Sequence, residues 1–215
     1  MVRGFDPTVI LVLNLAGTFV FGLSGGLAGV RARLDLLGVV VLSFVVALAG
    51  GITRDLLIGV APATFRDGRY LAAAAAAGIV SFVARPTLER RDSALTFFDA
   101  IGLGLFCVTG ASAALAHHLG PVQSTILGAI TGVGGGMVRD LLLREIPNIL
   151  RTDLYAVPAL LGATVLVVAH QAGSRSALFP LVAAGVCIAT RLLAVRYRIG
   201  LPIAPSERKK EPPSN

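Results

Sequence analysis

The sequence predicts an all-α integral membrane protein with seven transmembrane helices. Hydrophobic residues make up 55 % of the 215-residue chain, and only 14 % of its residues are charged. A soluble domain carries about 25 % charged residues, because its surface must be hydrated. Here long uncharged runs alternate with short charged segments, which is typical of a chain that crosses a bilayer several times. The composition therefore excludes an ordinary soluble domain.

Seven stretches qualify as spans when charges and Pro or Gly breaks are taken as their boundaries. A span needs about 20 apolar residues to cross a hydrocarbon core of about 30 Å. The first stretch is too long for a signal peptide and is expected to stay uncleaved. The predicted spans are 8–30, 36–60, 70–84, 94–116, 121–143, 154–172 and 176–195. Residues 1–199 would then form one transmembrane domain, and the polar, Pro-rich residues 200–215 a disordered cytoplasmic tail.

The basic residues predict the orientation of these spans. Cytoplasmic loops of membrane proteins are enriched in Lys and Arg. Counted by loop, twelve basic residues fall on one side (Arg31, Arg33, Arg85, Arg90, Arg91, Arg144, Arg151, Arg196, Arg198, Arg208, Lys209, Lys210) and four on the other (Arg3, Arg66, Arg69, Arg175). We therefore expect the N-terminus outside the cell and the C-terminus in the cytoplasm.

Several functional classes are disfavoured by the same residues. The net charge is +7, but the charged residues lie between apolar runs and at the end of the chain, without interleaved aromatic residues. This placement argues against nucleic-acid binding. Cys107 and Cys187 lie inside apolar runs and are expected to be core residues without a disulfide. His117 and His118 stand at a span end before a Gly-Pro turn, where a turn is expected and a metal site is not. No Ser/His/Asp, Cys/His or paired-carboxylate pattern suggests an enzyme, a cofactor or a metal.

An internal repeat is the most informative feature of the sequence. Residues 50–70 and 135–155 align without a gap at an offset of 85 residues, with nine of 21 positions identical. The register continues over about 10–84 and 95–169, pairing Asn14 with Asp99, Gly17 with Gly102, Phe21 with Phe106 and Gly25 with Gly110. Each copy holds three spans, an odd number, so the second copy must enter the membrane from the opposite side. This predicts inverted repeats, an architecture of many transporters, with a seventh helix at about 176–195 outside them.

Spans two and five carry the same motif, a glycine cluster followed three residues later by Arg-Asp. The clusters are Gly50, Gly51 and Gly134, Gly135, Gly136, and the dipeptides are Arg54-Asp55 and Arg139-Asp140. Glycine lowers the free-energy cost of bending or unwinding a helix, so the clusters predict breaks near the membrane midplane. Close packing of small residues between helices is the alternative interpretation.

The four charges need partners, because each costs about 2.5–3.5 kcal/mol at the centre of a span. Adjacent residues do not face each other on a helix, which disfavours pairing within each dipeptide. We therefore expect pairing across the repeat, of Arg54 with Asp140 and of Arg139 with Asp55. Asp99, at the start of span four, is a competing partner for either arginine.

Three hydroxyl-bearing residues lie on the two glycine-containing spans and are expected to line a pathway. They are Ser43, Thr53 and Thr131. A hydroxyl inside a helix often bonds only its own backbone, which is the alternative for each of them.

These motifs resemble a known family. The segments GGITRD and GGGMVRD, DAIGLGLF at 99–106, and PNILR followed by DLY are similar to the prokaryotic trimeric intracellular cation (TRIC) channels, a group formerly labelled as putative glycine transporters. The resemblance covers about 5–198. It implies a homotrimer in the prokaryotic plasma membrane with one pore in each protomer, conducting potassium and, less selectively, sodium.

The resemblance also implies roles for individual residues. Spans two and five would bend at their glycines and line the pore, and Arg139, with Arg54 as its counterpart, would belong to a charged or voltage-responsive gate. Ala49 stands where a full first triplet would have glycine, so the bend of span two is expected to be milder. The lysine with which animal members bind phosphoinositide is not evident, which disfavours lipid regulation.

Two other functions remain open from the sequence. A secondary transporter of a small solute such as glycine is permitted by the inverted repeat and by the older family label. A membrane packing protein without transport is the third interpretation.

Overall fold

The computed structural model describes residues 5–84, 93–150, 154–174 and 176–200, and its elements are helices. In chain order they are α1 (Pro7–Arg31), α2 (Leu36–Ile58), α3 (Ala63–Arg66), α4 (Gly68–Val83), α6 (Ala94–Ala116), α7 (Pro121–Leu142), the 3₁₀ turn η1 (Asn148–Leu150), α8 (Ala156–Gln171) and α9 (Leu178–Arg196). The all-helical class predicted from the sequence is confirmed.

Each predicted span corresponds to one helix whose ends lie within two residues of the predicted ones. The short elements α3 and η1 were not predicted. Four helices, α1, α2, α6 and α9, are long and apolar enough to cross a membrane, while α4 and α8 are apolar but only 16 residues long. At 1.5 Å per residue, 16 residues span about 24 Å, less than a full hydrocarbon core. Of the predicted tail, 200–215, the residues from 201 onward lie outside the described part of the chain.

Aspartate caps explain where the helices of the first half begin. Asp6 precedes α1, with Pro7 in its first turn, Asp35 precedes α2, and Asp67 precedes α4. Each carboxylate accepts a hydrogen bond from a backbone N–H of the first turn, over 2.7 to 3.0 Å, which supplies a partner that the helix itself lacks. The side chain of Arg69 also bonds Asp67 and lowers the pKa of that carboxyl.

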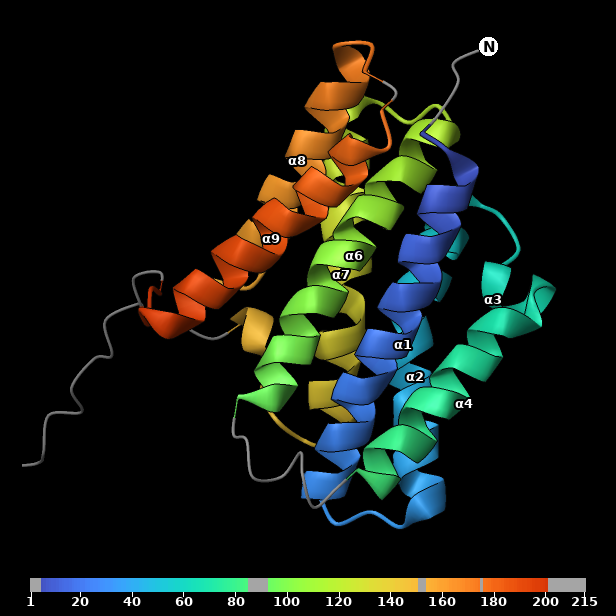
Figure 1. Ribbon diagram of the computed structural model, residues 1–215, viewed down its shortest axis with the longest axis vertical. Coiled ribbons are helices and arrows are strands. Elements are labelled where there is room, and N and C mark those ends of the chain that lie inside the picture. Colours follow the sequence, from blue (N-terminus) through green and yellow to red (C-terminus); the bar gives the residue numbers. More distant parts are fainter. Residues whose placement is uncertain (1–4, 85–92, 151–153, 175, 201–215) are drawn as a thin grey trace, which may run out of the picture.

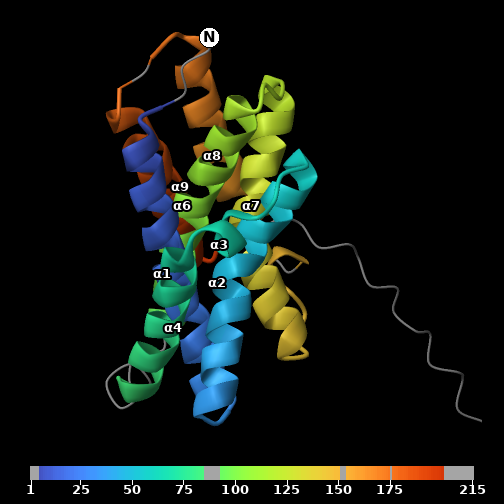
Figure 2. The same cartoon turned by 90° about the vertical axis from the view of Figure 1, so that its right-hand side faces the viewer.

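The two halves of the chain run in opposite directions. In Figure 1, α1 and α4 descend and α2 ascends, whereas α6 and α8 ascend and α7 descends. Figure 2 shows the same directions after a quarter turn. Helices at equivalent positions of the sequence repeat are therefore antiparallel to one another, and α9, which has no counterpart, lies along α8 and α6.

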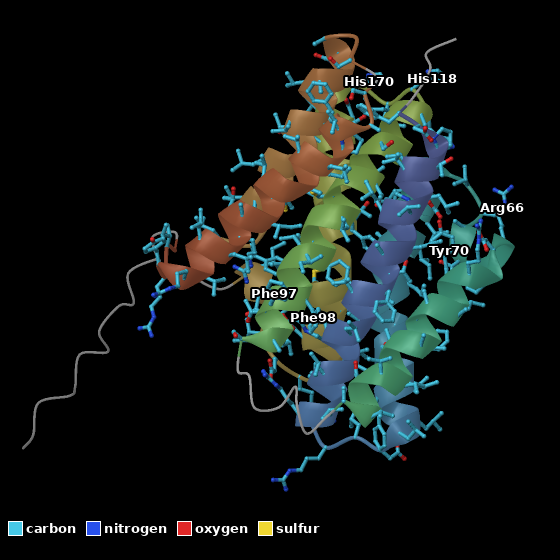
Figure 3. The ribbon with its side chains drawn as sticks, viewed as in Figure 1. Arg66, Tyr70, Phe97, Phe98, His118 and His170 are labelled. Atoms are coloured by element: carbon cyan, nitrogen blue, oxygen red, sulfur yellow. The ribbon has the colours of Figure 1, made fainter. Side chains whose placement is uncertain are left out.

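The turns between helices recur at the repeat offset. Arg33 and His118, 85 residues apart, both have positive φ, of 57° and 60°. Gly59 (83°) and Arg144 (59°) form a second such pair. His118 and His170 mark one end of the bundle in Figure 3, the end opposite to the turn that joins α1 to α2. The turn interpretation of His118 is thus confirmed.

The centre of the bundle is an aromatic pair, Phe21 of α1 and Phe106 of α6. Their ring centroids are 5.1 Å apart, and both side chains are fully buried. Each ring lies over a glycine of the other helix. A Cβ at Gly102 would come within 2.7 Å of the Phe21 ring, and one at Gly17 within 2.6 Å of the Phe106 ring. These two glycines make room for the rings, so α1 and α6 pack closely.

The glycine clusters bring α2 and α7 into backbone contact. A Cβ at Gly50 would collide with the carbonyl oxygen of Thr131, and one at Gly135 would lie 2.6 Å from the carbonyl oxygen of Val46. A Cβ on Gly134 would lie 3.0 Å from the Cα of Gly50. Both helices continue without interruption through these clusters, so the predicted unwinding is wrong, whereas a bend at the glycines stays a prediction. Here the glycines serve close packing, the alternative interpretation.

We expect Gly50→Ala to lower the free energy of unfolding by about 1–3 kcal/mol, the usual cost of overpacking. The reason is that the new methyl group would meet a backbone carbonyl, which cannot swing aside as a side chain can. Gly51→Ala is the matched control, since its nearest neighbour is the Arg54 guanidinium at 4.0 Å. Unfolding of the purified protein in detergent measures both variants, and equal losses would contradict the described crossing.

Candidate functional site

The two Arg-Asp dipeptides are buried near the ends of α2 and α7, and each pairs within itself. Arg54 Nε lies 2.7 Å from Asp55 Oδ1, and Arg139 Nε and Nη2 lie 2.9 and 2.8 Å from Asp140 Oδ1. The predicted pairings of Arg54 with Asp140 and of Arg139 with Asp55 are therefore wrong. Adjacent residues do not face each other on a helix, but an arginine side chain is long enough to fold back onto the neighbouring carboxylate.

The second oxygen of each carboxylate ties down the chain beyond the helix. Asp55 Oδ2 accepts from the backbone N–H of Ala63 at 2.8 Å, and Asp140 Oδ2 from that of Asn148 at 2.9 Å. In both copies the donor stands eight residues after the aspartate and begins the short element α3 or η1. Each carboxylate thus holds both the arginine beside it and the backbone eight residues later.

Arg139 is the centre of the second charged cluster, which we define as Arg139, Asp140, Asp99, Tyr155 and Ser24. Its Nη1 lies 2.6 Å from Asp99 Oδ1 and donates to the Ser24 hydroxyl at 2.7 Å. Tyr155 donates its hydroxyl hydrogen to the same Asp99 oxygen at 3.2 Å. The side chain of Arg139 is only 2 % exposed, so two carboxylates and a hydroxyl replace its hydration. The expectation that Asp99 competes for an arginine is confirmed for Arg139.

The first charged cluster, Arg54, Asp55, Asn14 and Tyr70, is built on the equivalent positions. Asn14 donates its amide hydrogen to the Tyr70 hydroxyl at 3.1 Å. Tyr70 lies near the start of α4 (Figure 3). The principal chemical difference between the clusters is that Asn14 stands where the second copy has the carboxylate of Asp99.

Each cluster lines a cavity. The second cavity has a volume of about 320 Å³ and is lined by Arg139, Asp140 and Asn148 together with Arg31 and Glu145. The first is much smaller, about 10 Å³, and is lined by Asn14, Arg54, Thr64 and Tyr70 among others. Space of about 10–15 Å³ accommodates a single water molecule. The structure therefore offers a wide space, lined by charged and apolar residues, at one cluster and a nearly closed one at the other.

The hydroxyl groups expected along a pathway do not line these two cavities. Ser43 is fully buried and donates to the carbonyl of Gly22 at 2.8 Å, and Thr131 donates to that of Leu127, one turn back, at 2.7 Å. The side chain of Thr53 is exposed. These three residues contribute to neither of the two cavities described above. Their place along a pathway stays a prediction.

Glycine also shapes the second cluster directly. A Cβ at Gly136 would collide with the Tyr155 hydroxyl and lie 3.2 Å from Asp99 Oδ1. The glycines therefore do more than let two helices cross. Tyr155 and Ser24 were not selected from the sequence as site residues, although the pairing of Tyr70 with Tyr155 at the repeat offset was a usable signal for the first of them.

Apolar helices around buried ion pairs define a multi-pass membrane protein. The family model described as "Glycine transporter" matches the chain twice, over residues 11–86 and 96–171. The starts of the two matches differ by 96 − 11 = 85 residues, the offset of the internal repeat.

Proteins with similar sequences are also named as membrane proteins. A UPF0126 membrane protein of Streptomyces coelicolor is 47 % identical over 205 residues, which cover 94 % of this chain and 94 % of the relative. The UPF0126 inner membrane protein YadS of Escherichia coli K12 is 36 % identical over 197 residues, 88 % of this chain and 93 % of the relative.

Solved structures give the same result. The TRIC trimeric intracellular cation channel orthologue from Rhodobacter sphaeroides is 33 % identical with a TM-score of 0.85, covering 89 % of this chain and 100 % of that one. A second TRIC cation channel is 35 % identical with a TM-score of 0.83, covering 92 % and 98 %. The chain belongs to the TRIC family of membrane proteins.

A double-mutant cycle tests the pairing of Arg139. We expect Arg139→Gln and Asp99→Asn to be non-additive by about 0.5–3 kcal/mol in free energy of unfolding, since the two side chains are in direct contact. The control cycle combines Arg139→Gln with Asp55→Asn, which lies in the other cluster and is expected to be additive within about 0.5 kcal/mol. Unfolding in mixed micelles supplies the values. Coupling to Asp55 without coupling to Asp99 would contradict the described pairs.

Proposed function

We propose that the chain is a monovalent-cation channel that conducts potassium and also sodium. The observation that carries the proposal is similarity to solved TRIC cation channels over about nine-tenths of the chain, at 33 % and 35 % identity. Fold likeness alone would be weak support, because one fold hosts many functions. Here the family model also matches residues 11–86 and 96–171, which include both charged clusters.

We further propose seven spans arranged as two inverted repeats plus α9, with the N-terminus outside and the C-terminus in the cytoplasm. The antiparallel course of equivalent helices and the recurrence of turns and contacts at 85 residues support the inversion. The excess of basic residues in the loops on one side supports the orientation. The protein would then lie in a prokaryotic plasma membrane.

The proposed pore runs within each protomer, between the two cavities and past the crossing of α2 and α7. In the described conformation this route is closed, because Phe21 packs on Phe106 and the backbone at Gly50 touches that at Thr131. Opening then requires these helices to separate. Both arginines are paired with carboxylates, so their positive charges do not by themselves repel cations.

Arg139 is the proposed gating charge. It reaches across from α7 to Asp99 on α6 and Ser24 on α1, so its release would loosen three helices at once. A unit charge that crosses the full membrane potential gains about 2.3 kcal/mol per 100 mV. That energy is comparable to the strength of a buried hydrogen-bonded charge pair.

A homotrimer is proposed on the same similarity, because a structural neighbour is named as trimeric. Large apolar side chains on α2 and α9 that are about half exposed or more, such as Leu37, Leu56, Leu57, Val182 and Leu193, are available to contact other copies or lipid tails.

Transport of a small solute such as glycine is the second candidate. It is favoured by the description of the matching family model and by the proposed inverted repeats, which occur in many secondary transporters. A transporter requires saturable, coupled uptake, whereas a channel conducts without a coupling ion.

Single-channel recording in a planar bilayer under a potassium gradient distinguishes the two. We expect discrete openings that reverse near the potassium equilibrium potential, and an altered voltage dependence for Arg139→Gln. Arg66→Gln is the matched control, because Arg66 is exposed on the short helix α3. Silence at all voltages, together with saturable glycine uptake by proteoliposomes, would replace the channel by the transporter.

A further inference from the structure

Arg191 of α9 is a buried cation with incomplete bonding. The residue is 3 % exposed, and its Nη1 donates to the carbonyl of Leu154 at 3.0 Å. Its Nε is buried without a hydrogen-bond partner. A buried charge that is so poorly bonded is costly unless an opposite charge lies near. Because the side chain is buried, it does not serve as an anchor that reaches water at the membrane surface.

Arg191 lies over the aromatic ring of Tyr155. The guanidinium carbon of Arg191 lies 4.7 Å from the centroid of the Tyr155 ring. The hydroxyl of the same tyrosine is bonded to Asp99, which in turn holds Arg139. The ring therefore stands between a cation from α9 and a carboxylate from α6. A cation over an aromatic face is attracted by it, and more strongly in a desolvated site.

The charges of the two clusters explain why such a cation is needed in one of them. The first cluster has one arginine and one aspartate, because Asn14 is neutral. The second has one arginine and two aspartates, because Asp99 replaces that asparagine. Counted with Arg191, the second cluster is neutral as well. Since α9 stands outside the repeat, the first half has no equivalent of Arg191.

We propose that Arg191 is a positioning residue that balances the charge of Asp99 through Tyr155 and so keeps Asp99 on Arg139. The seventh helix thereby becomes part of the charged site, although it lies outside the duplicated unit. A consequence for gating rests on the proposed channel function, whereas the charge balance itself does not.

Thermal stability of the purified protein tests the balance without any measurement of current. Arg191→Gln is expected to lower Tm by at least about 5 °C, because it leaves the buried second cluster with one uncompensated negative charge. Arg191→Lys, which keeps the charge, should lose less. Adding Asp99→Asn to Arg191→Gln gives the second cluster the neutral composition of the first and is expected to restore most of the lost Tm.

A second double variant controls for net charge. Asp67→Asn combined with Arg191→Gln has the same net charge as the rescued variant, and asparagine at Asp67 still caps α4. This combination should not restore Tm. The inference is overturned if Arg191→Gln leaves Tm unchanged, or if Asp99→Asn restores no more Tm than Asp67→Asn does. If Arg191→Gln yields no folded protein, recovery of folded protein in the double variant with Asp99→Asn, but not in the one with Asp67→Asn, supports the inference. Failure of both double variants overturns it.

Recording from the same variants addresses the gate. If the channel function holds, Arg191→Gln should shift the voltage of half-maximal opening, and Asp99→Asn should reverse most of that shift. A missing current in the unmodified protein would remove the channel proposal but leave the stability cycle intact, so the two failures are distinguishable.

Discussion

The approach of α2 and α7 to backbone contact is the constraint on which the rest of the structure depends. Only a residue without a side chain permits it, as the contact of Gly50 with the Thr131 carbonyl shows. Phe21 and Phe106 meet beside this crossing, over glycines of their own. The crossing also fixes how far apart the C-terminal ends of α2 and α7 lie. Because each of those ends carries Arg-Asp, the same glycines determine where the buried charges stand.

The buried charges are stabilised because each aspartate binds two groups at once. One oxygen holds the neighbouring arginine, and the other holds the backbone eight residues later. A buried charge without a partner is costly, and all four of these side chains are buried, so their pairing is what permits the burial. The pairing is equivalent in both halves, but the second half adds Asp99 and binds its arginine more extensively. The asymmetry between Asn14 and Asp99 thus makes one arginine the more firmly held.

The sequence was sufficient to predict what depends on hydrophobic length and on repetition. The ranges of the long helices came from runs of apolar residues, and the equivalence of Tyr70 with Tyr155 came from the offset of 85 residues. Partner choice was not predictable in the same way. Asp55 binds both Arg54 and the backbone of Ala63 eight residues later, and Arg191 contacts Leu154 and Tyr155 just before α8. Such contacts arise from tertiary structure, which the spacing of residues along a helix does not encode.

Thiol labelling tests most directly whether the two halves of the chain are inverted across the membrane. Ala32 and His117 are exposed, have negative φ and lie 85 residues apart in equivalent turns. The native Cys107 and Cys187 are fully buried, which leaves a low background. A membrane-impermeant thiol reagent applied to intact cells should label His117→Cys and leave Ala32→Cys unlabelled until the cells are opened. Labelling of both variants from the same side would contradict the inverted arrangement.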